Sequence, residues 1–305
     1  MGGKIEIVEV GPRDGLQTEA QVLPVADRLE LIARLEACGV RRIEAVSFVD
    51  PRRVPQMAGA EEIMAGLPHE DGRARIGLAL NLKGWERAVQ AGVDEVNVVL
   101  SASDAFGLRN QGMGVQAQLA MLAEIARRAH NMTASGPGPS LSATISVAFG
   151  CPFEGEVSGA RVVEIAREAA RLGIKEIALA DTIGVADPWT VRARVEAVKI
   201  AAPDARLRLH AHDTRGAGLA NAFAALEAGA EVLDASCGGL GGCPFAPGAT
   251  GNIATEDLVY MLQRAGFDTG LDLDGLIDTA GWICAKLGRP PASALSRAGG
   301  FGALA

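Results

Sequence analysis

Short runs of β-branched and apolar residues recur along the chain, and each is followed by a longer amphipathic stretch. The runs predict strands, and apolar positions spaced three and four apart in the stretches between them predict helices. The ranges that we expect to form strands are 5–10, 42–46, 76–80, 95–100, 142–148, 176–180, 206–210 and 232–236. The expected helices are 25–37, 54–65, 84–91, 115–129, 158–172, 188–200, 216–228 and 255–264.

This alternation of strands and helices predicts a single (β/α)8 TIM barrel with a short C-terminal helical extension. An open, doubly wound sheet is the alternative, but no G-x-G-x-x-G follows the first strand, which argues against its dinucleotide-binding version. We expect the barrel to span residues 1–267. Residues 268–305 are expected to form the helical extension, with a loose tail from 297 onward.

Composition and charge narrow the range of partners. Of 305 residues, 49% are apolar, which excludes a disordered chain. Because 29 basic residues face 37 acidic ones, no basic surplus is left to bind nucleic acid.

The five cysteines include no C-x-x-C pair, which argues against a zinc ribbon and fits a reducing compartment. No apolar run approaches the roughly 18 residues of a membrane span, and residues 1–10 favour a strand over a secretion signal. We therefore expect a cytoplasmic protein that binds neither nucleic acid nor a membrane.

Polar residues gather where the predicted strands end, which is where barrel enzymes carry their reactive groups. His210 and His212 lie two apart at the end of the seventh strand, so both imidazoles face one side and can reach one metal ion. Asp14, after the first strand, is the natural third ligand, and Asn252 offers a neutral oxygen. Such a nitrogen and oxygen set fits Mg²⁺, Mn²⁺ or another divalent ion better than structural zinc.

Three further residues suggest enolate chemistry beside this metal site. Arg13 can stabilise a carbonyl oxygen as it becomes an enolate. Glu44 lies within an apolar strand, so if it faces inward it must be paired or protonated, and Arg13 is its expected partner. Cys243 lies in the Gly-rich segment 238–252, which lacks the P-loop pattern. We interpret this segment as a lid over the metal site, with Cys243 as a proton donor or nucleophile.

Seven motifs then carry a resemblance to a known family. They are GPRDGLQ at 11–17, IEAVSFV at 43–49, NLKG at 81–84, GCPFEG at 150–155, DTIGV at 181–185, HAHDT at 210–214 and the Gly-rich segment that ends in GN at 251–252. In this order the motifs resemble 3-hydroxy-3-methylglutaryl-CoA lyases, from Val8 to about Leu262. The wider superfamily of metal-dependent Claisen-type barrels shares the Arg-Asp pair and His-x-His, but the first motif and the Cys243 segment favour the lyase branch.

The resemblance implies a carbon–carbon lyase that cleaves 3-hydroxy-3-methylglutaryl-CoA to acetyl-CoA and acetoacetate by a retro-Claisen step. It implies that Mg²⁺ or Mn²⁺ is bound by Asp14, His210, His212 and Asn252. Either Asp14 or His210 would take the proton of the substrate hydroxyl. Arg13, oriented by Glu44, would stabilise the enolate, and Cys243 would protonate it. The expected substrate-binding residues are Gln17, Asn81, Asp181 and Thr182. The expected partner is an acyl-CoA thioester, and the expected assembly is a homodimer or higher homo-oligomer.

Three departures from the family pattern leave the acyl group open. They are Arg215 in place of a common Tyr, the run SVAF at 146–149, and the segment 104–114, which lacks a Lys-Asn-Ile-Asn stretch. A lyase for citramalyl-CoA or another branched 3-hydroxyacyl-CoA is therefore an alternative. A synthase running the condensation from acetyl-CoA is a second alternative, although little chain remains after the barrel for the extra region that such synthases carry. A CoA-sensing barrel without catalysis is a third, and it would have no need for Cys243 as a proton donor.

Overall fold

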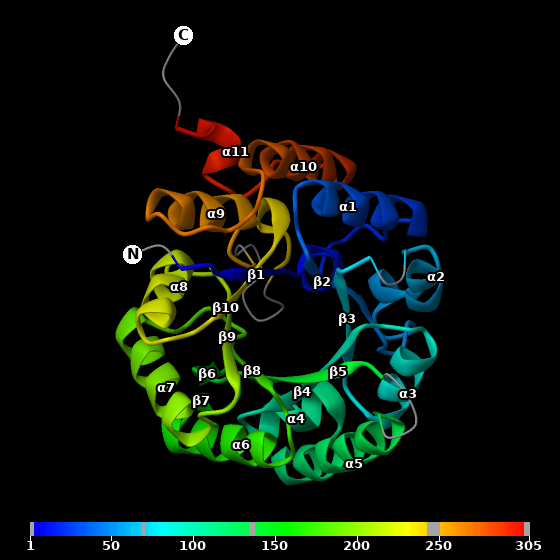
Figure 1. The fold of residues 1–305 in the computed structure, drawn as a ribbon, viewed down its shortest axis with the longest axis vertical. Coiled ribbons are helices and arrows are strands. Elements are labelled where there is room, and N and C mark those ends of the chain that lie inside the picture. The colour runs from blue at the N-terminus through cyan, green and yellow to red at the C-terminus, as the bar shows by residue number, and fades with distance from the viewer. Residues whose placement is uncertain (1–2, 69–70, 134–137, 243–250, 302–305) are drawn as a thin grey trace.

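Eight parallel strands close into a barrel in a computed structural model that describes residues 3–68, 71–133, 138–242 and 251–301. The strands follow one another around the barrel in the order β1-β10-β9-β8-β5-β4-β3-β2. Figure 1 looks along the barrel and shows the helices as a ring around the strands. The prediction of a single (β/α)8 barrel is confirmed, and the open-sheet alternative is wrong because β1 pairs with both β10 and β2.

Every predicted strand is present, with ends within two residues of those expected. The barrel strands are β1 (Glu6–Glu9), β2 (Arg42–Ser47), β3 (Ala74–Ala79), β4 (Glu95–Ser101), β5 (Ser140–Ser146), β8 (Glu176–Asp181), β9 (Arg206–Ala211) and β10 (Val232–Ala235). The helices are α1 (Val25–Ala37), α2 (Ala60–Ala65), α3 (Leu82–Gln90), α4 (Asp104–Gln111), α5 (Val115–Thr133), α6 (Gly159–Arg171), α7 (Pro188–Ala201), α8 (Gly218–Glu227), α9 (Thr255–Arg264), α10 (Leu273–Lys286) and α11 (Leu295–Ala298). Short elements complete the fold, namely the π-type turn η1 (Gly11–Gly15), the 3₁₀ turns η2 (Pro55–Met57) and η3 (Cys237–Gly239), and the hairpin β6 (Gly150–Cys151) and β7 (Gly155–Glu156).

The structure corrects the expected helices in three places. The single helix expected over 54–65 is two elements, η2 and α2, because Gly59 between them has a φ of +77°. The helix α4 was not predicted, and its first turn is capped by Ser103, whose Oγ accepts the N–H of Phe106. The expected loose tail from 297 overlaps α11, so the last ordered turn extends to Ala298.

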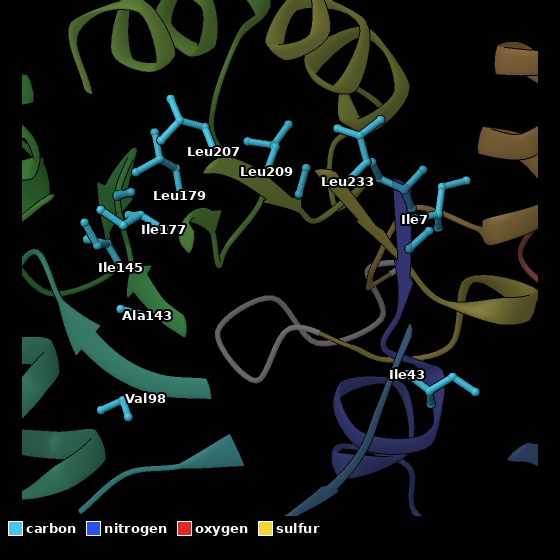
Figure 2. Packing of buried hydrophobic residues seen from close by; sticks show 14 of the residues in the cluster. Ile7, Ile43, Val98, Ala143, Ile145, Ile177, Leu179, Leu207, Leu209 and Leu233 are labelled. Atoms are coloured by element: carbon cyan, nitrogen blue, oxygen red, sulfur yellow. The ribbon is translucent and has the colours of Figure 1, made fainter. Parts of the chain in front are cut away.

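The main hydrophobic core lies between the strands and the surrounding helices. Leu207 and Leu209 point outward toward the helices (Figure 2). Successive side chains of a strand point to opposite faces, so Arg208 and His210 face the barrel interior. A small separate apolar cluster among the described residues consists of Val8, Val10, Ile76 and Val232. Most of the apolar surface buried in the described part of the chain therefore lies outside the ring of strands.

Paired charges cross the lower part of the barrel interior. Arg42 of β2 donates from Nη2 to Glu95 Oε2 of β4 at 2.6 Å, and from Nη1 to Glu176 Oε2 of β8 at 2.8 Å. These strands are not neighbours in the barrel, so the bonds span its interior. Arg208 of β9 extends the network, because its Nη1 lies 3.3 Å from Glu176 and its Nε lies 3.4 Å from Asp234 Oδ1. The network thus links the floor of the barrel to the ends of β9 and β10.

One buried carboxyl group holds the loops that follow the first and last strands. Glu9 ends β1, and its Oε1 accepts the backbone N–H groups of Gly11 at 2.7 Å and of Cys237 at 3.0 Å. Its Oε2 accepts the hydroxyl of Thr255, the first residue of α9, at 2.6 Å. Burial raises the pKa of Glu9 to about 7, although these three hydrogen bonds oppose the shift. The loop after β1, the turn after β10 and the start of α9 therefore share one anchor.

The C-terminal helices pack on the side of the barrel where the chain begins and ends. The helix α10 packs against α1 and α9, at the top of the view in Figure 1, and it also contacts η3. The division of the chain at residue 267 stays a prediction. No helix in the described ranges combines the length and the apolar character that a bilayer crossing requires.

We predict that the interior charge network contributes strongly to folding. Replacing Arg42 with Met leaves Glu95 and Glu176 buried without their main cation, and should lower the free energy of unfolding by about 3–5 kcal/mol. The matched control is Arg52→Met, because Arg52 pairs with Asp50 while 88% of its side chain is exposed, and its loss should change stability little. Urea unfolding followed by circular dichroism measures both. Equal effects of the two variants would contradict the prediction.

A second prediction concerns the pH dependence that Glu9 imposes on stability. Its pKa is raised from 4.5 to about 7 in the folded state, so its contribution to stability is complete below pH 4.5 and is lost as the pH rises through 7. In Glu9→Gln, the amide replaces the protonated carboxyl and does not titrate. The stability of the native protein minus that of this variant should therefore fall by about 3 kcal/mol between pH 4.5 and 8. A difference that stays constant over this range in urea titrations contradicts the assignment.

Candidate active site

A cavity of about 580 Å³ opens at the C-terminal ends of the barrel strands. Most of the residues proposed from the sequence line it, and they come from loops that are far apart in the chain. Those that line it are Arg13, Asp14, Gln17, Asn81, Thr182, His210 and His212. Glu44 lies directly beneath Arg13, and Asn252 lies beside Asp14. Cys243 lies outside the described residues.

Three potential metal ligands converge in this cavity. The ligand atoms of Asp14, His210 and His212 all lie within 4.8 Å of one another. The Nε2 atoms of the two histidines are 3.2 Å apart, and Asp14 Oδ2 lies 3.5 Å from Nε2 of His212 and 3.9 Å from Nε2 of His210. The spacing of two along β9 therefore has the predicted effect of directing both imidazoles at one point.

Backbone pairing brings Asn252 to the same point. Residues His212 and Asn252 form an isolated antiparallel bridge, and Asp213 donates its N–H to the carbonyl of Gly251 at 2.7 Å. The Nδ2 of Asn252 donates to Asp14 Oδ2 at 2.8 Å and to the carbonyl of Leu240 at 3.2 Å. Asp14 Oδ2 and the carbonyl of Leu240 are both acceptors, so the Asn252 atom that faces them is the amide nitrogen. Its Oδ1 is buried and has no partner among the described residues.

This donor set suits a divalent cation. A buried amide oxygen without a partner costs free energy, and coordination of a cation would satisfy Asn252 Oδ1. Burial by itself raises the pKa of Asp14, but Arg13, His210 and His212 outweigh it and hold that pKa well below its usual value. The carboxylate is therefore ionised and available as a ligand. Two imidazole nitrogens, one carboxylate and one amide oxygen form a mixed ligand set for a divalent cation and leave positions for substrate.

The side chain of Arg13 lies between the carboxylates of Glu44 and Asp14. The pairing of Arg13 with Glu44 is the one predicted from the sequence. The Nε of Arg13 donates to Glu44 Oε2 at 2.6 Å, and its Nη1 donates to Asp14 Oδ1 at 2.5 Å. Glu44 also accepts the Nδ2–H of Asn97 at 3.0 Å, which fixes the carboxylate from the other side. Burial lowers the pKa of Arg13, but the charges of Glu44 and Asp14 raise it above the ordinary value overall. The guanidinium is thus a permanent cation on the cavity wall.

The structure adds Asp234, which the sequence reasoning missed. Its Oδ2 lies 3.1 Å from Nδ1 of His210, on the side of the ring opposite the metal ligand atoms. Asp234 is a charged residue within a short apolar strand, and the same signal identified Glu44. Asn97 and Thr144 also line the cavity from β4 and β5, and Thr144 donates its hydroxyl to Asn97 Oδ1 at 3.0 Å.

Two neighbouring residues at the end of β8 have different surroundings. Thr182 lines the cavity, and its Oγ1 accepts the N–H of Val147 at 2.8 Å. Val147 has a φ of +50°, a strained conformation for a β-branched residue, and the bond to Thr182 helps to hold it. Asp181 does not line the cavity that the described residues form. Its carboxylate instead accepts the N–H groups of Val185 and Ala186 at 2.9 and 3.0 Å and so supports the turn after β8.

The two described ends of the Gly-rich segment cross each other beside the ligands. A Cβ atom at Gly251 would lie only 2.4 Å from the carbonyl carbon of Gly241, so only glycine permits this approach. Gly241 has a φ of +113°, which side chains rarely adopt. Gly242, the residue before Cys243 in the sequence, lines the cavity.

Two of the three departures from the family pattern line the cavity, and the third does not. Ser146 lies on its wall, and α4 contributes Phe106, Arg109, Asn110 and Gln111. Arg215 instead donates from Nη1 to the carbonyls of Ile183 at 2.8 Å and Gly184 at 2.9 Å, which fastens the turn after β8. Arg215 is absent from the cavity lining that the described residues form.

Comparisons with known proteins agree with this geometry. The HMGL-like family model matches residues 4–283. The chain is 43% identical over 297 residues to the 3-hydroxy-3-isohexenylglutaryl-CoA/hydroxy-methylglutaryl-CoA lyase of Pseudomonas aeruginosa, covering 97% of each protein. It is 45% identical to the (R)-citramalyl-CoA lyase of Chloroflexus aurantiacus over 305 residues, covering 97% of this chain and 95% of that protein.

A solved relative has the same fold over nearly its whole length. The structure of an HMG-CoA lyase from Acinetobacter baumannii in complex with coenzyme A and 3-methylmalate matches with a TM-score of 0.92 and 41% identity, covering 99% of this chain and 97% of that one. The barrel, the ligand cluster at its rim and these relatives together show that the chain belongs to the HMGL-like family and is a carbon–carbon lyase of the hydroxymethylglutaryl-CoA lyase type.

Proposed function

We propose that this protein cleaves 3-hydroxy-3-methylglutaryl-CoA to acetyl-CoA and acetoacetate by a divalent-metal-dependent retro-Claisen reaction. The observation that carries the proposal is the convergence of Asp14, His210 and His212 beside the guanidinium of Arg13 in one cavity. In this reaction the C3 hydroxyl loses its proton, the C2–C3 bond breaks, and the electron pair stays on C2 as the enolate of acetyl-CoA. The enolate then takes a proton at C2.

Four residues would hold the metal ion, which we propose is Mg²⁺ or Mn²⁺. They are Asp14, His210, His212 and Asn252. When bound, such an ion lowers the pKa of a hydroxyl group that it coordinates and orients the substrate carboxylate. The buried and unpartnered Oδ1 of Asn252 supports the presence of a cation at this position.

Asp14 is the better of the two proposed acceptors for the hydroxyl proton. The Nε2 atom of His210 has a single lone pair, so it cannot act as a metal ligand and accept a proton at the same time. Asp14 has two oxygens, and each carboxylate oxygen has more than one acceptor position. Oδ2 faces the histidines while Oδ1 accepts from Arg13, so the carboxylate can keep its ligand role when a proton arrives.

Arg13 stabilises the charge that develops on the thioester oxygen. Its guanidinium is held by Glu44 and Asp14 before substrate arrives, so little reorganisation is needed as the enolate forms. Asn97 in turn orients Glu44. Cys243 would protonate the enolate at C2. After product release its thiolate would regain a proton from solvent and Asp14 would release the proton that it accepted, so that no net proton is gained or lost.

The lining of the cavity supports our proposal that the protein binds a CoA thioester. Arg53 and Arg109 are exposed cations that line the cavity, and they can attract the phosphates of coenzyme A. Arg109 lies with its Cζ 3.9 Å from the ring centroid of Phe153, which supports its position. Gln17, Asn81 and Thr182 offer hydrogen bonds to the acyl part. Substrate contact by Asp181, a cytoplasmic location and a homo-oligomeric state stay predictions.

A second candidate function is cleavage of (R)-citramalyl-CoA. It is favoured by the 45% identity to the citramalyl-CoA lyase of Chloroflexus aurantiacus. The catalytic residues would be the same, because both substrates carry a hydroxyl group and a carboxylate on a branched acyl chain. The two candidates differ in the acyl group, which the side chains of Thr144, Ser146 and α4 would contact.

We predict that the purified protein forms acetyl-CoA from 3-hydroxy-3-methylglutaryl-CoA in the presence of Mn²⁺, and that chelation by EDTA abolishes the reaction. The assay should compare this substrate with citramalyl-CoA and with a longer 3-alkyl-3-hydroxyglutaryl-CoA, using kcat/KM for each. A higher kcat/KM for citramalyl-CoA would move the assignment to the second candidate. Absence of cleavage of all three thioesters with Mn²⁺ present would refute both.

Two substitutions should separate proton donation from metal binding. Cys243→Ser should lower kcat by about 100-fold or more, because a hydroxyl is a much weaker acid than a thiol, and should leave Mn²⁺ affinity unchanged. His210→Ala should instead reduce Mn²⁺ occupancy, measured by metal analysis after dialysis. Cys38→Ser is the matched control, since Cys38 lies at the end of α1 with its Sγ 3.8 Å from Thr279 Oγ1. Near-native kcat in Cys243→Ser would remove the thiol from its role.

A further inference from the structure

Asp234 and His210 are neighbours on the inner face of the barrel. The strands β9 and β10 pair with Arg208 opposite Val232 and Leu209 opposite Leu233, so the next residues along the two strands are His210 and Asp234. Asp234 Oδ2 lies 3.1 Å from His210 Nδ1, and the two residues are 4% and 7% exposed. The contact is therefore fixed by the register of the sheet and is shielded from water.

A buried cation holds the other side of the same carboxylate. Arg208 is 2% exposed, and its Nε lies 3.4 Å from Asp234 Oδ1. Its Nη1 lies 3.3 Å from Glu176 Oε1, and its Nη2 donates to Thr144 Oγ1 at 3.4 Å. Asp234 Oδ2 thus accepts from the ring of His210, whereas Oδ1 forms an ion pair with Arg208 without a hydrogen bond among the described residues.

This arrangement determines which nitrogen of His210 carries the proton. A carboxylate is only an acceptor, so the contact at Oδ2 requires the hydrogen to be on Nδ1 of the ring. The lone pair is then on Nε2, which lies 3.2 Å from Nε2 of His212 and 3.9 Å from Asp14 Oδ2. That is the nitrogen required for a metal ligand.

We propose that Asp234 is a positioning residue, held by Arg208, that keeps His210 in the Nδ1–H tautomer with Nε2 directed at the metal site. The inference rests on the proposed metal site for its consequence in metal affinity, but the tautomer itself is a property of the protein without metal. Partner groups of this kind orient metal-binding histidines and raise metal affinity.

The variant Asp234→Asn tests the proposal because an amide cannot accept on both sides. Arg208 Nε has no hydrogen-bond partner among the described residues and lies 3.4 Å from the Oδ1 position, so it favours the amide oxygen there, and the NH₂ group is turned toward Nδ1 of His210. His210 is then forced into the Nε2–H tautomer, which has no lone pair on the metal side. We expect the Kd for Mn²⁺ to rise by about 10- to 100-fold.

The tautomer can be read directly by NMR of protein labelled with ¹⁵N-histidine, since the chain has only four histidines. The signal of His210 is identified by its loss in His210→Gln. At alkaline pH the native protein should show His210 as the Nδ1–H form, and Asp234→Asn should show the Nε2–H form. Mn²⁺ affinity is measured in parallel by electron paramagnetic resonance of the free ion.

The matched control is Asp187→Asn, which removes one negative charge at an exposed helix cap without contact to a histidine, and should change neither readout. An Nε2–H form of His210 in the native protein overturns the proposal, and this measurement decides it even if Asp234→Asn does not fold. An unchanged tautomer or an unchanged Kd in folded Asp234→Asn also overturns it. If the native protein binds no Mn²⁺, the metal site fails, whereas the tautomer result still decides the role of Asp234.

Discussion

The charges buried inside the barrel are the constraint on which the rest of this structure depends. Each buried ion costs several kcal/mol unless a partner of opposite charge reaches it, and the partners of Arg42 come from strands on other sides of the barrel. A strand shifted by one residue would place its charges in the apolar layer beneath the helices. The pairing of Arg42 and Arg208 with Glu95, Glu176 and Asp234 therefore favours this strand register over a shifted one.

The geometry of the site at the rim depends on these interior charges and on the hydrogen bonds of Glu9, which hold the loops above them. The ring of His210 contacts the carboxylate of Asp234, and this carboxylate forms an ion pair with Arg208. A proposed metal ligand is therefore connected to the floor of the barrel by direct contacts. Asp14 and Asn252 are 238 residues apart in the chain, yet their side chains are hydrogen-bonded. Only closure of the barrel between β1 and β10 brings them together.

The sequence predicted those features that depend on local pattern or on a strand end. The strands, the joint direction of His210 and His212, and the pairing of Glu44 with Arg13 all follow from residue spacing and from the cost of an unpaired charge. It did not predict the tautomer-determining contact of Asp234, because that contact depends on the register between two strands. The substrate role expected for Asp181 lacks support because its backbone partners depend on the turn that follows β8. The helix α4 was missed because its residues show little apolar periodicity.

Stability and chemistry occupy different layers of this molecule. The large apolar core lies outside the strands, under the helices (Figure 2). The cavity wall includes small polar residues such as Thr144, Ser146 and Thr182. Exchanges among such residues reshape the space offered to an acyl group while they leave the outer core intact. Relatives that act on different thioesters can therefore remain about equally similar to this chain, at 43% and 45% identity.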